Sequence, residues 1–190
     1  MSLRMHPTEL AGVQRVEPDV YTDDRGYFME TFHQRRYEET GIRLAMVQTN
    51  LSRSVRGVLR GLHYQLQRPQ AKLVQVIRGE IFDVAADIRT GSPTFGRWTG
   101  HLLSENNHRQ LFIPEGFAHG FLVLSDVADV LYHCTDFYTI GDEYGVRWND
   151  PDLAVDWPDC ERIFSLKDAS LPLLATLDTR LLPAVRPAEE

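Results

Sequence analysis

Between residues 45 and 140 the chain is a series of short stretches in which hydrophobic and polar side chains alternate. In residues 81–88 one face carries Phe82, Val84, Ala86 and Ile88, and the other carries Asp83, Ala85 and Asp87. A period of two is typical of a β-strand. Residues 72–77 form a second strand-like stretch just before it, and the turn at Gly79 between the two predicts a β-hairpin.

Further strands and turns follow from the same pattern. Strands are expected at residues 110–113, 120–124 and 130–135, and turns at residues 90–93, 114–116 and 125–126. Strands this short and this regularly spaced predict an all-β sandwich or barrel.

Helix is expected only in short pieces. One piece covers residues 35–40 and ends at Gly41. Another covers residues 171–181, where four leucines share a face with the 3.6-residue period of a helix. Residues 183–190 are expected to form a loose tail.

The length of 190 residues fits one domain, and neither a repeat nor a flexible linker divides the sequence. We therefore expect a single domain over residues 1–190, with its core at about residues 10–177. No hydrophobic run approaches the ~18 residues of a membrane span, and the N-terminus lacks the apolar stretch of a signal peptide. The two cysteines, Cys134 and Cys160, have no metal-ligand spacing, so we expect free thiols in a cytoplasmic protein.

The charge balance narrows the class of partner. Twenty Lys and Arg residues against 27 Asp and Glu residues give a net charge of −7, so the molecule as a whole repels polyanions. This argues against nucleic acid as the main partner. It leaves room for a small basic pocket that binds one phosphorylated ligand.

The densest polar cluster in strand-like sequence is Arg-Gly-Leu-His-Tyr-Gln, which starts at Arg60. Arg60, His63 and Gln65 cannot all point to one side of a regular strand, so the sequence predicts a β-bulge or a polar interior. A single histidine in a strand is more often an ordinary hydrogen-bonded side chain than a functional one. Together with Lys72 and the polar residues 48–50, however, it is typical of a barrel lined for a polar ligand.

A second cluster contains Pro114-x-Gly116-x-x-His119, which matches half of the cupin signature. In that signature a turn ends and the histidine points into a β-barrel. The other half, His-x-His followed by Glu, supplies the remaining metal ligands, and the chain contains no His-x-His. The sequence therefore favours a cupin-like barrel without a metal site.

A third cluster contains Tyr132 and Tyr138. Tyrosines in strands usually serve packing. The presence of His63 and Lys72, however, favours a chemical role for Tyr132. A base, a group that offsets negative charge and a proton donor are what proton abstraction beside a carbonyl requires. Asp168 alone fits a surface or helix-start position, whereas a carboxylate beside the base would fix the tautomer of its ring.

Several longer motifs, in the same order along the chain, resemble those of the dTDP-4-dehydrorhamnose 3,5-epimerase family. They are Gln48-Thr49-Asn50, residues 57–65, residues 92–96, residues 113–121, residues 132–138 and Trp148-Asn149-Asp150-Pro151. The resemblance covers roughly residues 10–175. It implies a cupin-like jelly roll, a double-stranded β-helix barrel with a few short helices, which forms a homodimer and uses neither a metal nor a cofactor.

The resemblance also implies roles for individual residues. His63 is expected to be the base with Asp168 as its partner, Lys72 to lie beside the 4-keto oxygen of the sugar, and Tyr132 to be the acid. Tyr138 is expected to stack on the thymine ring. Further substrate-binding residues implied by the motifs are Arg25, Phe28, Glu30, Gln48, Thr49, Asn50, Arg60, His119, Glu143 and Lys167. Arg25 and Glu30 are expected to contact the nucleotide and, in the dimer, to reach the neighbouring subunit's site.

The activity implied by the resemblance is inversion of C3 and C5 of dTDP-4-dehydro-6-deoxy-D-glucose, which gives dTDP-4-dehydro-L-rhamnose without a redox change. The nearest alternative is an epimerase that acts at one carbon, or a ketoisomerase of a dTDP-4-keto-6-deoxy sugar. Two other classes stay open. A metal-dependent cupin oxygenase would hold a transition metal, and a non-catalytic sugar-binding module would bind its ligand without solvent exchange.

Overall fold

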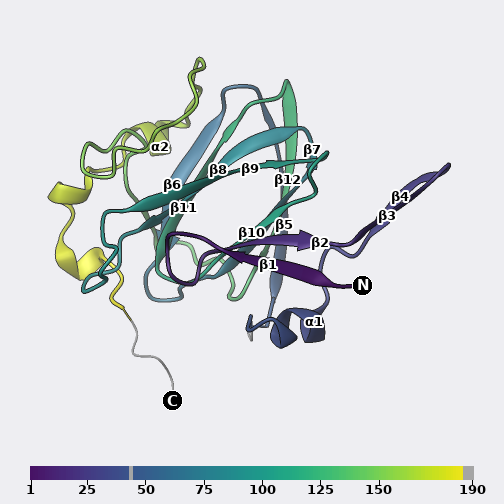
Figure 1. The fold of residues 1–190 in the computed structure, drawn as a ribbon. Coiled ribbons are helices and arrows are strands. Elements are labelled where there is room, and N and C mark those ends of the chain that lie inside the picture. Colours follow the sequence, from purple (N-terminus) through teal and green to yellow (C-terminus); the bar gives the residue numbers. More distant parts are fainter. Residues whose placement is uncertain (43–44, 186–190) are drawn as a thin grey trace.

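The computed structural model describes residues 1–42 and 45–185, and it is built mainly of strands that form two facing sheets (Figure 1). In spatial order, the six-stranded sheet contains β1 (Leu3–Pro7), β2 (Gln14–Pro18), β10 (Gln110–Ile113), β7 (Lys72–Arg78), β12 (Val127–Cys134) and β5 (Gln48–Val55). The five-stranded sheet contains β13 (Glu143–Gly145), β6 (Leu59–Gln65), β11 (Phe117–Val123), β8 (Glu80–Asp87) and β9 (Trp98–Ser104). Every pairing within these sheets is antiparallel, and the fold is the predicted cupin-like jelly roll.

Outside the two sheets lie a hairpin and a few short helical elements. The hairpin consists of β3 (Val20–Asp23) and β4 (Gly26–Met29), and Figure 1 shows it as an arm that stands away from the body. The helical elements are α1 (Gln34–Glu39), α2 (Leu166–Ala169) and the 3₁₀ turns η1 (Leu174–Thr176) and η2 (Thr179–Leu181). None of the helices in the described part of the chain is long and apolar enough to cross a membrane.

The space between the two sheets is filled at one end by a hydrophobic core. Val74 and Val76 of β7 meet Ile81 and Ala85 of β8 there, together with Phe117 of β11. Side chains that alternate along these strands bury about half of each strand in this layer. The rest of the interior is left for polar side chains.

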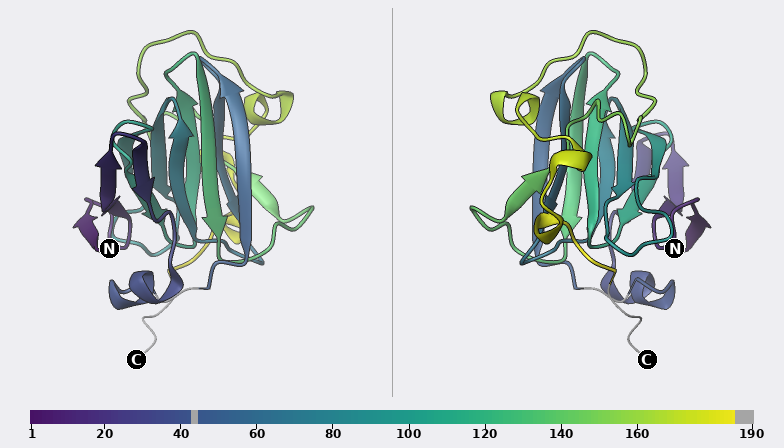
Figure 2. Two further views of the ribbon diagram at one scale, coloured as in Figure 1. Left: turned by 90° about the vertical axis from the view of Figure 1, so that its right-hand side faces the viewer. Right: turned by 90° about the vertical axis from the view of Figure 1, so that its left-hand side faces the viewer.

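The outer faces of the two sheets are covered to different extents. Across the five-stranded sheet lies the C-terminal segment, where Leu174 and Trp157 pack against Val84 and Ala86 of β8 (Figure 2, right). On the six-stranded sheet, α1 covers only one end (Figure 2, left), and its Tyr37 is buried there. The rest of that face leaves hydrophobic side chains such as Leu51 and Val55 exposed.

The prediction that residues 72–77 and 81–88 form a hairpin is wrong. β7 pairs with β10 and β12 in one sheet, whereas β8 pairs with β9 and β11 in the other. Between the two strands lies Gly79, whose φ of +79° turns the chain from sheet to sheet; a Cβ atom there would lie 2.1 Å from the carbonyl oxygen of Val127. Both faces of β8 are buried, and this burial is available only between the core and the C-terminal segment.

The expected helix over residues 171–181 is also replaced. The segment forms the two separate turns η1 and η2, because external partners take its backbone groups. Asp150 accepts a hydrogen bond from the backbone of Leu174 at 2.7 Å, and the Tyr64 hydroxyl donates to the carbonyl of Leu181 at 2.8 Å. The leucines therefore reach the sheet one by one instead of as a helical face.

Other expected elements are present with small shifts. β10 has the predicted bounds, β11 begins at Phe117 instead of residue 120, and β12 begins at Val127 instead of residue 130. α1 lies where a short helix is expected. Of the predicted tail, Pro183 and Val185 are tied to Thr90 by backbone hydrogen bonds, and residues 186–190 lie outside the described part.

Candidate active site

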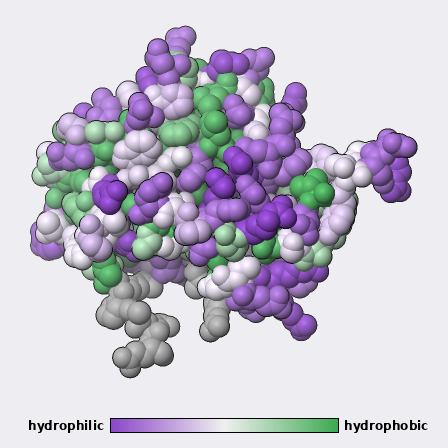
Figure 3. Space-filling model, viewed as in Figure 1, coloured by the Kyte–Doolittle hydropathy of each residue, from purple (hydrophilic) through white to green (hydrophobic). Residues whose placement is uncertain are grey.

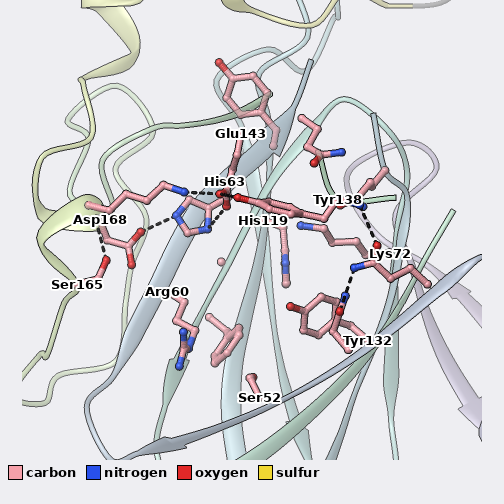
Figure 4. A pocket seen from close by; sticks show the side chains of 18 residues that line it. Ser52, Arg60, His63, Lys72, His119, Tyr132, Tyr138, Glu143, Ser165 and Asp168 are labelled. Atoms are coloured by element: carbon pink, nitrogen blue, oxygen red, sulfur yellow. Dashed lines mark hydrogen bonds and ion pairs between the residues drawn. The ribbon is translucent and has the colours of Figure 1, made fainter. Parts of the chain in front are cut away.

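A cavity of about 440 Å³ lies between the two sheets (Figure 4). Among the residues that line it are Gln48, Asn50, Ser52, Arg60, His63, Lys72, His119, Tyr132, Tyr138, Glu143, Lys167 and Asp168. They come from strands of both sheets, from the β12–β13 connection and from α2. The fold thus brings together residues that are up to 120 positions apart in the sequence, as Gln48 and Asp168 are.

The six-stranded sheet forms one wall of this cavity. Alternation along β5 turns Gln48 and Asn50 inward, and Tyr132 of β12 is the direct cross-strand partner of Asn50. Lys72 at the start of β7 pairs with Cys134 of β12, so its side chain also faces the interior. The proposed acid and the proposed enolate-stabilising cation therefore share a wall.

The five-stranded sheet forms the opposite wall, and its strand pairing is irregular at this point. His119 of β11 lies opposite His63 of β6, but two residues further along, Phe121 lies opposite Arg60, so β6 contains a bulge. Gly61 makes the bulge possible: its φ is +106°, and a Cβ atom there would lie 2.5 Å from the carbonyl oxygen of His119. The bulge lets Arg60 and His63 line the same cavity, as the sequence pattern requires.

His63 lies between two carboxylates. Its Nε2 is 2.5 Å from Oδ1 of Asp168, and its Nδ1 is 3.5 Å from Oε1 of Glu143. Asp168 is only 5% exposed and is held by α2, where its backbone N–H donates to the Ser165 hydroxyl at 3.0 Å. A carboxylate on Nε2 fixes the ring so that Nδ1 is the nitrogen that can accept a proton.

Glu143 connects this histidine to the rim of the cavity. Its Oε2 accepts hydrogen bonds from the ammonium of Lys167 and, at 3.0 Å, from the hydroxyl of Tyr138. Burial alone would raise the pKa of Glu143, but the contacts with Lys167, His63 and Tyr138 outweigh burial and lower it. Glu143 is therefore a carboxylate at neutral pH, with its Oε1 beside Nδ1 of His63.

Lys72 and Tyr132 have pKa values shifted by the interior. Burial lowers the pKa of Lys72, although the charges of Cys134, Glu143 and Asp83 act against this shift. For Tyr132, burial is also the main cause and raises its pKa above 10, so the phenol keeps its proton at neutral pH. The wall thus presents the Lys72 amine and a phenolic proton donor side by side.

The structure keeps four predicted binding residues out of this cavity. Arg25 and Phe28 lie on the projecting β3–β4 hairpin, where Arg25 pairs with Asp23, and Glu30 just after the hairpin pairs with Arg36 at 2.6 Å. Thr49 points to the outer face of β5, and its hydroxyl is 2.8 Å from Nδ1 of His133. Alternation along a strand sends Thr49 to the opposite side from its two neighbours.

Several residues that contribute to the site were not among the predicted ones. Ser52 continues the inward-facing series of β5, and the period-two pattern could have extended the prediction to it. Ser165 caps α2, a role that its spacing of three residues from Asp168 signals. Gln65 accepts a hydrogen bond from the backbone of Thr139 at 2.8 Å and so positions the loop that carries Tyr138. Asp83 is 2.7 Å from Nε2 of His119.

The cupin motif around His119 raises the question of whether the site could bind a metal ion. Within residues 1–42 and 45–185, no three His, Cys, Asp or Glu side chains are grouped so that they could share a metal ion. His119, which occupies the position of the cupin motif histidine, pairs with a carboxylate instead.

Removal of the Asp168 charge should change how the free energy of unfolding depends on pH in acid. Burial raises the pKa of Asp168, but the hydrogen bond and charge of His63, with Ser165 and Lys167, lower it further than burial raises it. A carboxyl group whose pKa is lower in the fold stabilises it above the unfolded pKa of about 3.9, and loses this contribution as the pH falls through the folded value. Between about pH 4.5 and 2.5, urea unfolding should therefore show a smaller loss of unfolding free energy for Asp168→Asn than for the wild type. Parallel curves over this range would contradict the pairing.

Comparison with known proteins agrees with this geometry. A family model described as dTDP-4-dehydrorhamnose 3,5-epimerase matches residues 7–176. The enzyme of that name from Methanothermobacter thermautotrophicus is 57% identical over 155 residues, which cover 82% of this chain and 84% of the relative. A dTDP-4-dehydrorhamnose 3-epimerase from Streptomyces niveus is 41% identical over 184 residues, which cover 95% of this chain and 89% of the relative.

A crystal structure shows the same fold in detail. The dTDP-6-deoxy-D-glucose-3,5-epimerase of Legionella pneumophila, in complex with dTDP-4-keto-L-rhamnose, superposes with a TM-score of 0.95 at 51% sequence identity. The match covers 97% of this chain and 100% of the other. By sequence and by structure, the chain belongs to the dTDP-4-dehydrorhamnose 3,5-epimerase family.

Proposed function

We propose that the protein is an isomerase that inverts C3 and C5 of dTDP-4-dehydro-6-deoxy-D-glucose and so produces dTDP-4-dehydro-L-rhamnose. The observation that carries this proposal is the placement of base and acid on opposite walls. His63 stands on the five-stranded sheet, and Tyr132 stands on the six-stranded sheet across the cavity (Figure 4). Inversion at a carbon requires a proton to leave from one face and to return on the other, which is what two facing walls provide.

The chemistry follows from these positions. The C4 ketone acidifies the hydrogens on C3 and C5. His63 removes one of them through Nδ1; the C–H electron pair becomes a C=C double bond to C4, and the carbonyl π pair moves onto O4. The ammonium of Lys72 stabilises the negative oxygen, and Tyr132 gives a proton to the carbon from the opposite side. Asp168 and Glu143 stabilise the imidazolium formed in between.

The rim of the cavity fits the nucleotide part of this substrate. Tyr138 is half exposed, so its ring is free to stack on thymine, and Arg60 and Lys167 bring positive charge to the cavity. Cations of this kind bind diphosphates. Both cysteines of the chain are free thiols, in keeping with a protein of the reducing cytoplasm.

An epimerase that acts at C3 alone is the second candidate, because the Streptomyces niveus relative carries that name. Solvent exchange in D₂O distinguishes the two. With dTDP-4-dehydro-6-deoxy-D-glucose as substrate, we expect deuterium at both C3 and C5, observed by NMR. Deuterium at C3 alone would assign the single-site activity, and no deuterium at either carbon would contradict an epimerase altogether.

The two tyrosines of the site should respond differently to substitution. Tyr132→Phe keeps the ring but removes the proton donor, so formation of inverted product should fall by ~10²–10⁴-fold. Tyr138→Phe keeps the stacking face and should change the rate little, whereas Tyr138→Ala should raise KM because base stacking is worth ~1–3 kcal/mol. Steady-state kinetics of the three variants test the assignment. Loss of inversion in Tyr138→Phe with activity retained in Tyr132→Phe would exchange the two roles.

We also propose that the active unit is a homodimer whose hairpin contributes to the partner's site. Three hydrophobic side chains, Leu51, Val55 and Ile77, are exposed on the uncovered face of the six-stranded sheet, Leu51 to 65%. Phe28 of the hairpin is 61% exposed, and Figure 3 shows the hairpin as an arm with a hydrophobic patch where it joins the body. Exposed hydrophobic surface of this kind is typical of an interface between subunits.

Complementation between defective chains tests this arrangement. A chain with Arg25→Ala and Phe28→Ala, co-expressed with a His63→Ala chain, should form hybrid dimers that contain one complete site, which restores about a quarter of wild-type activity under random pairing. The matched control combines His63→Ala with Tyr132→Phe. Both of these defects lie in a chain's own cavity, so no hybrid contains a complete site. Equal activity in the two mixtures would contradict a shared site.

A further inference from the structure

One wall of the cavity carries a second histidine–aspartate pair, in which His119 lines the cavity and Asp83 lies behind it, and the mechanism above gives this pair no role in the reaction. Nε2 of His119 is 2.7 Å from Oδ1 of Asp83. Asp83 is 0% exposed and His119 8% exposed, so this pair lies deeper than His63 and Asp168. Oδ2 of Asp83 has no hydrogen-bond partner among the described residues.

A carboxylate buried in this way requires a compensating charge. Removal of an ionised carboxylate from water is costly, and proteins tolerate it where a cation is in contact. His119 is the side chain in direct contact with Asp83. An imidazolium, with a hydrogen on each ring nitrogen, is the form of His119 that would supply this charge while donating through Nε2 to Asp83.

The position of His119 directs its other nitrogen to the ligand. His119 and His63 are direct cross-strand partners on β11 and β6, so both rings point into the cavity. Because Asp83 occupies Nε2 of His119, Nδ1 is left for a ligand. In Figure 4, His119 and Lys72 approach the same part of the cavity from opposite sheets. Asp83 is also close enough to Lys72 that its charge partly opposes the burial that lowers the pKa of Lys72.

We propose that Asp83 is a positioning residue that keeps His119 as an imidazolium, whose Nδ1–H donates, together with Lys72, to O4 of the sugar as the enolate forms. This rests on the proposed function, because only a 4-keto sugar brings such an oxygen into the cavity. Loss of a proton from either C3 or C5 moves the carbonyl π pair onto the same O4. One oxyanion site built from His119 and Lys72 therefore serves both half-reactions.

The alternative is that His63 acts as the base for one of the two carbons and His119 acts as the base for the other. The two arrangements predict different isotope patterns. A group that stabilises O4 affects exchange at C3 and C5 by the same factor, whereas a base at one carbon affects exchange at that carbon alone.

The test uses Asp83→Asn, which keeps the acceptor for Nε2 but removes the charge. In D₂O with dTDP-4-dehydro-6-deoxy-D-glucose, exchange at C3 and at C5 should each fall by the same factor, ~10²-fold, in kcat. The affinity for dTDP, which lacks the keto sugar, should not change in calorimetry. His119→Gln should reproduce the pattern, and the Asp83→Asn/His119→Gln double variant should be no slower than His119→Gln, because Asp83 acts through His119.

Asp87→Asn is the matched control, since Asp87 is also 0% exposed on β8 but bonds to Arg89, Ser92 and Thr94 outside the cavity. It should lower Tm while both exchange rates stay at wild-type values. Loss of exchange at one carbon only, or additive losses in the double variant, would overturn the role of Asp83. If Asp83→Asn does not fold, His119→Gln still separates equal from unequal loss. A wild-type enzyme with no exchange at either carbon would instead contradict the proposed function.

Discussion

The site depends on the hydrogen bonds that tie the C-terminal segment to the start of β6, because they bring Asp168 to His63 from 105 positions away. The backbone N–H of Ile163 donates to the carbonyl of Gly57 at 2.8 Å. Gly57 has a φ of +81°, and a Cβ atom there would lie 2.2 Å from a backbone oxygen of the C-terminal segment, so glycine is required. From this contact the chain reaches Ser165, which caps α2 and aims Asp168 at His63. The contact between Asp168 and His63 is thus a consequence of how the segment is attached to the barrel.

The same arrangement solves an electrostatic problem. A chain with a net charge of −7 has to bind a dianionic diphosphate and then stabilise a third negative charge on the sugar. In and directly behind the cavity wall, each of three carboxylates has a basic partner: Asp168 contacts His63, Asp83 contacts His119, and Glu143 contacts Lys167. Among the described residues, the lining cations Arg60 and Lys72 form no ion pair, and they are available to the ligand. Local pairing therefore makes the cavity attractive to anions although the whole molecule is acidic.

Strand positions and inward-facing side chains could be predicted from the sequence, because a half-buried strand alternates and any polar residue on its inner face interrupts the hydrophobic pattern. The partners of a strand could not be predicted in this way, because alternation shows which side chains are buried but not which strands are paired. β7 and β8 are adjacent in sequence but lie in different sheets. For the same reason Asp83 looks like the polar face of an ordinary strand. The contact of Asp168 with His63 came only from the family resemblance, since no local pattern links residues so far apart.

If a single base, His63, serves both C3 and C5, then the substrate has to move between the two half-reactions while the protein stays in place. His63 and Tyr132 stand on strands that are hydrogen-bonded on both sides, so neither backbone can shift far without breaking a sheet. If Lys72 and His119 stabilise the oxyanion as proposed, O4 has to stay beside them in both half-reactions. On the proposed mechanism the sugar ring must therefore shift about O4, with the same ring face toward His63, to present C3 and then C5 to the same nitrogen. The nucleotide, held by exposed groups at the rim such as Tyr138, provides the anchor about which this movement takes place.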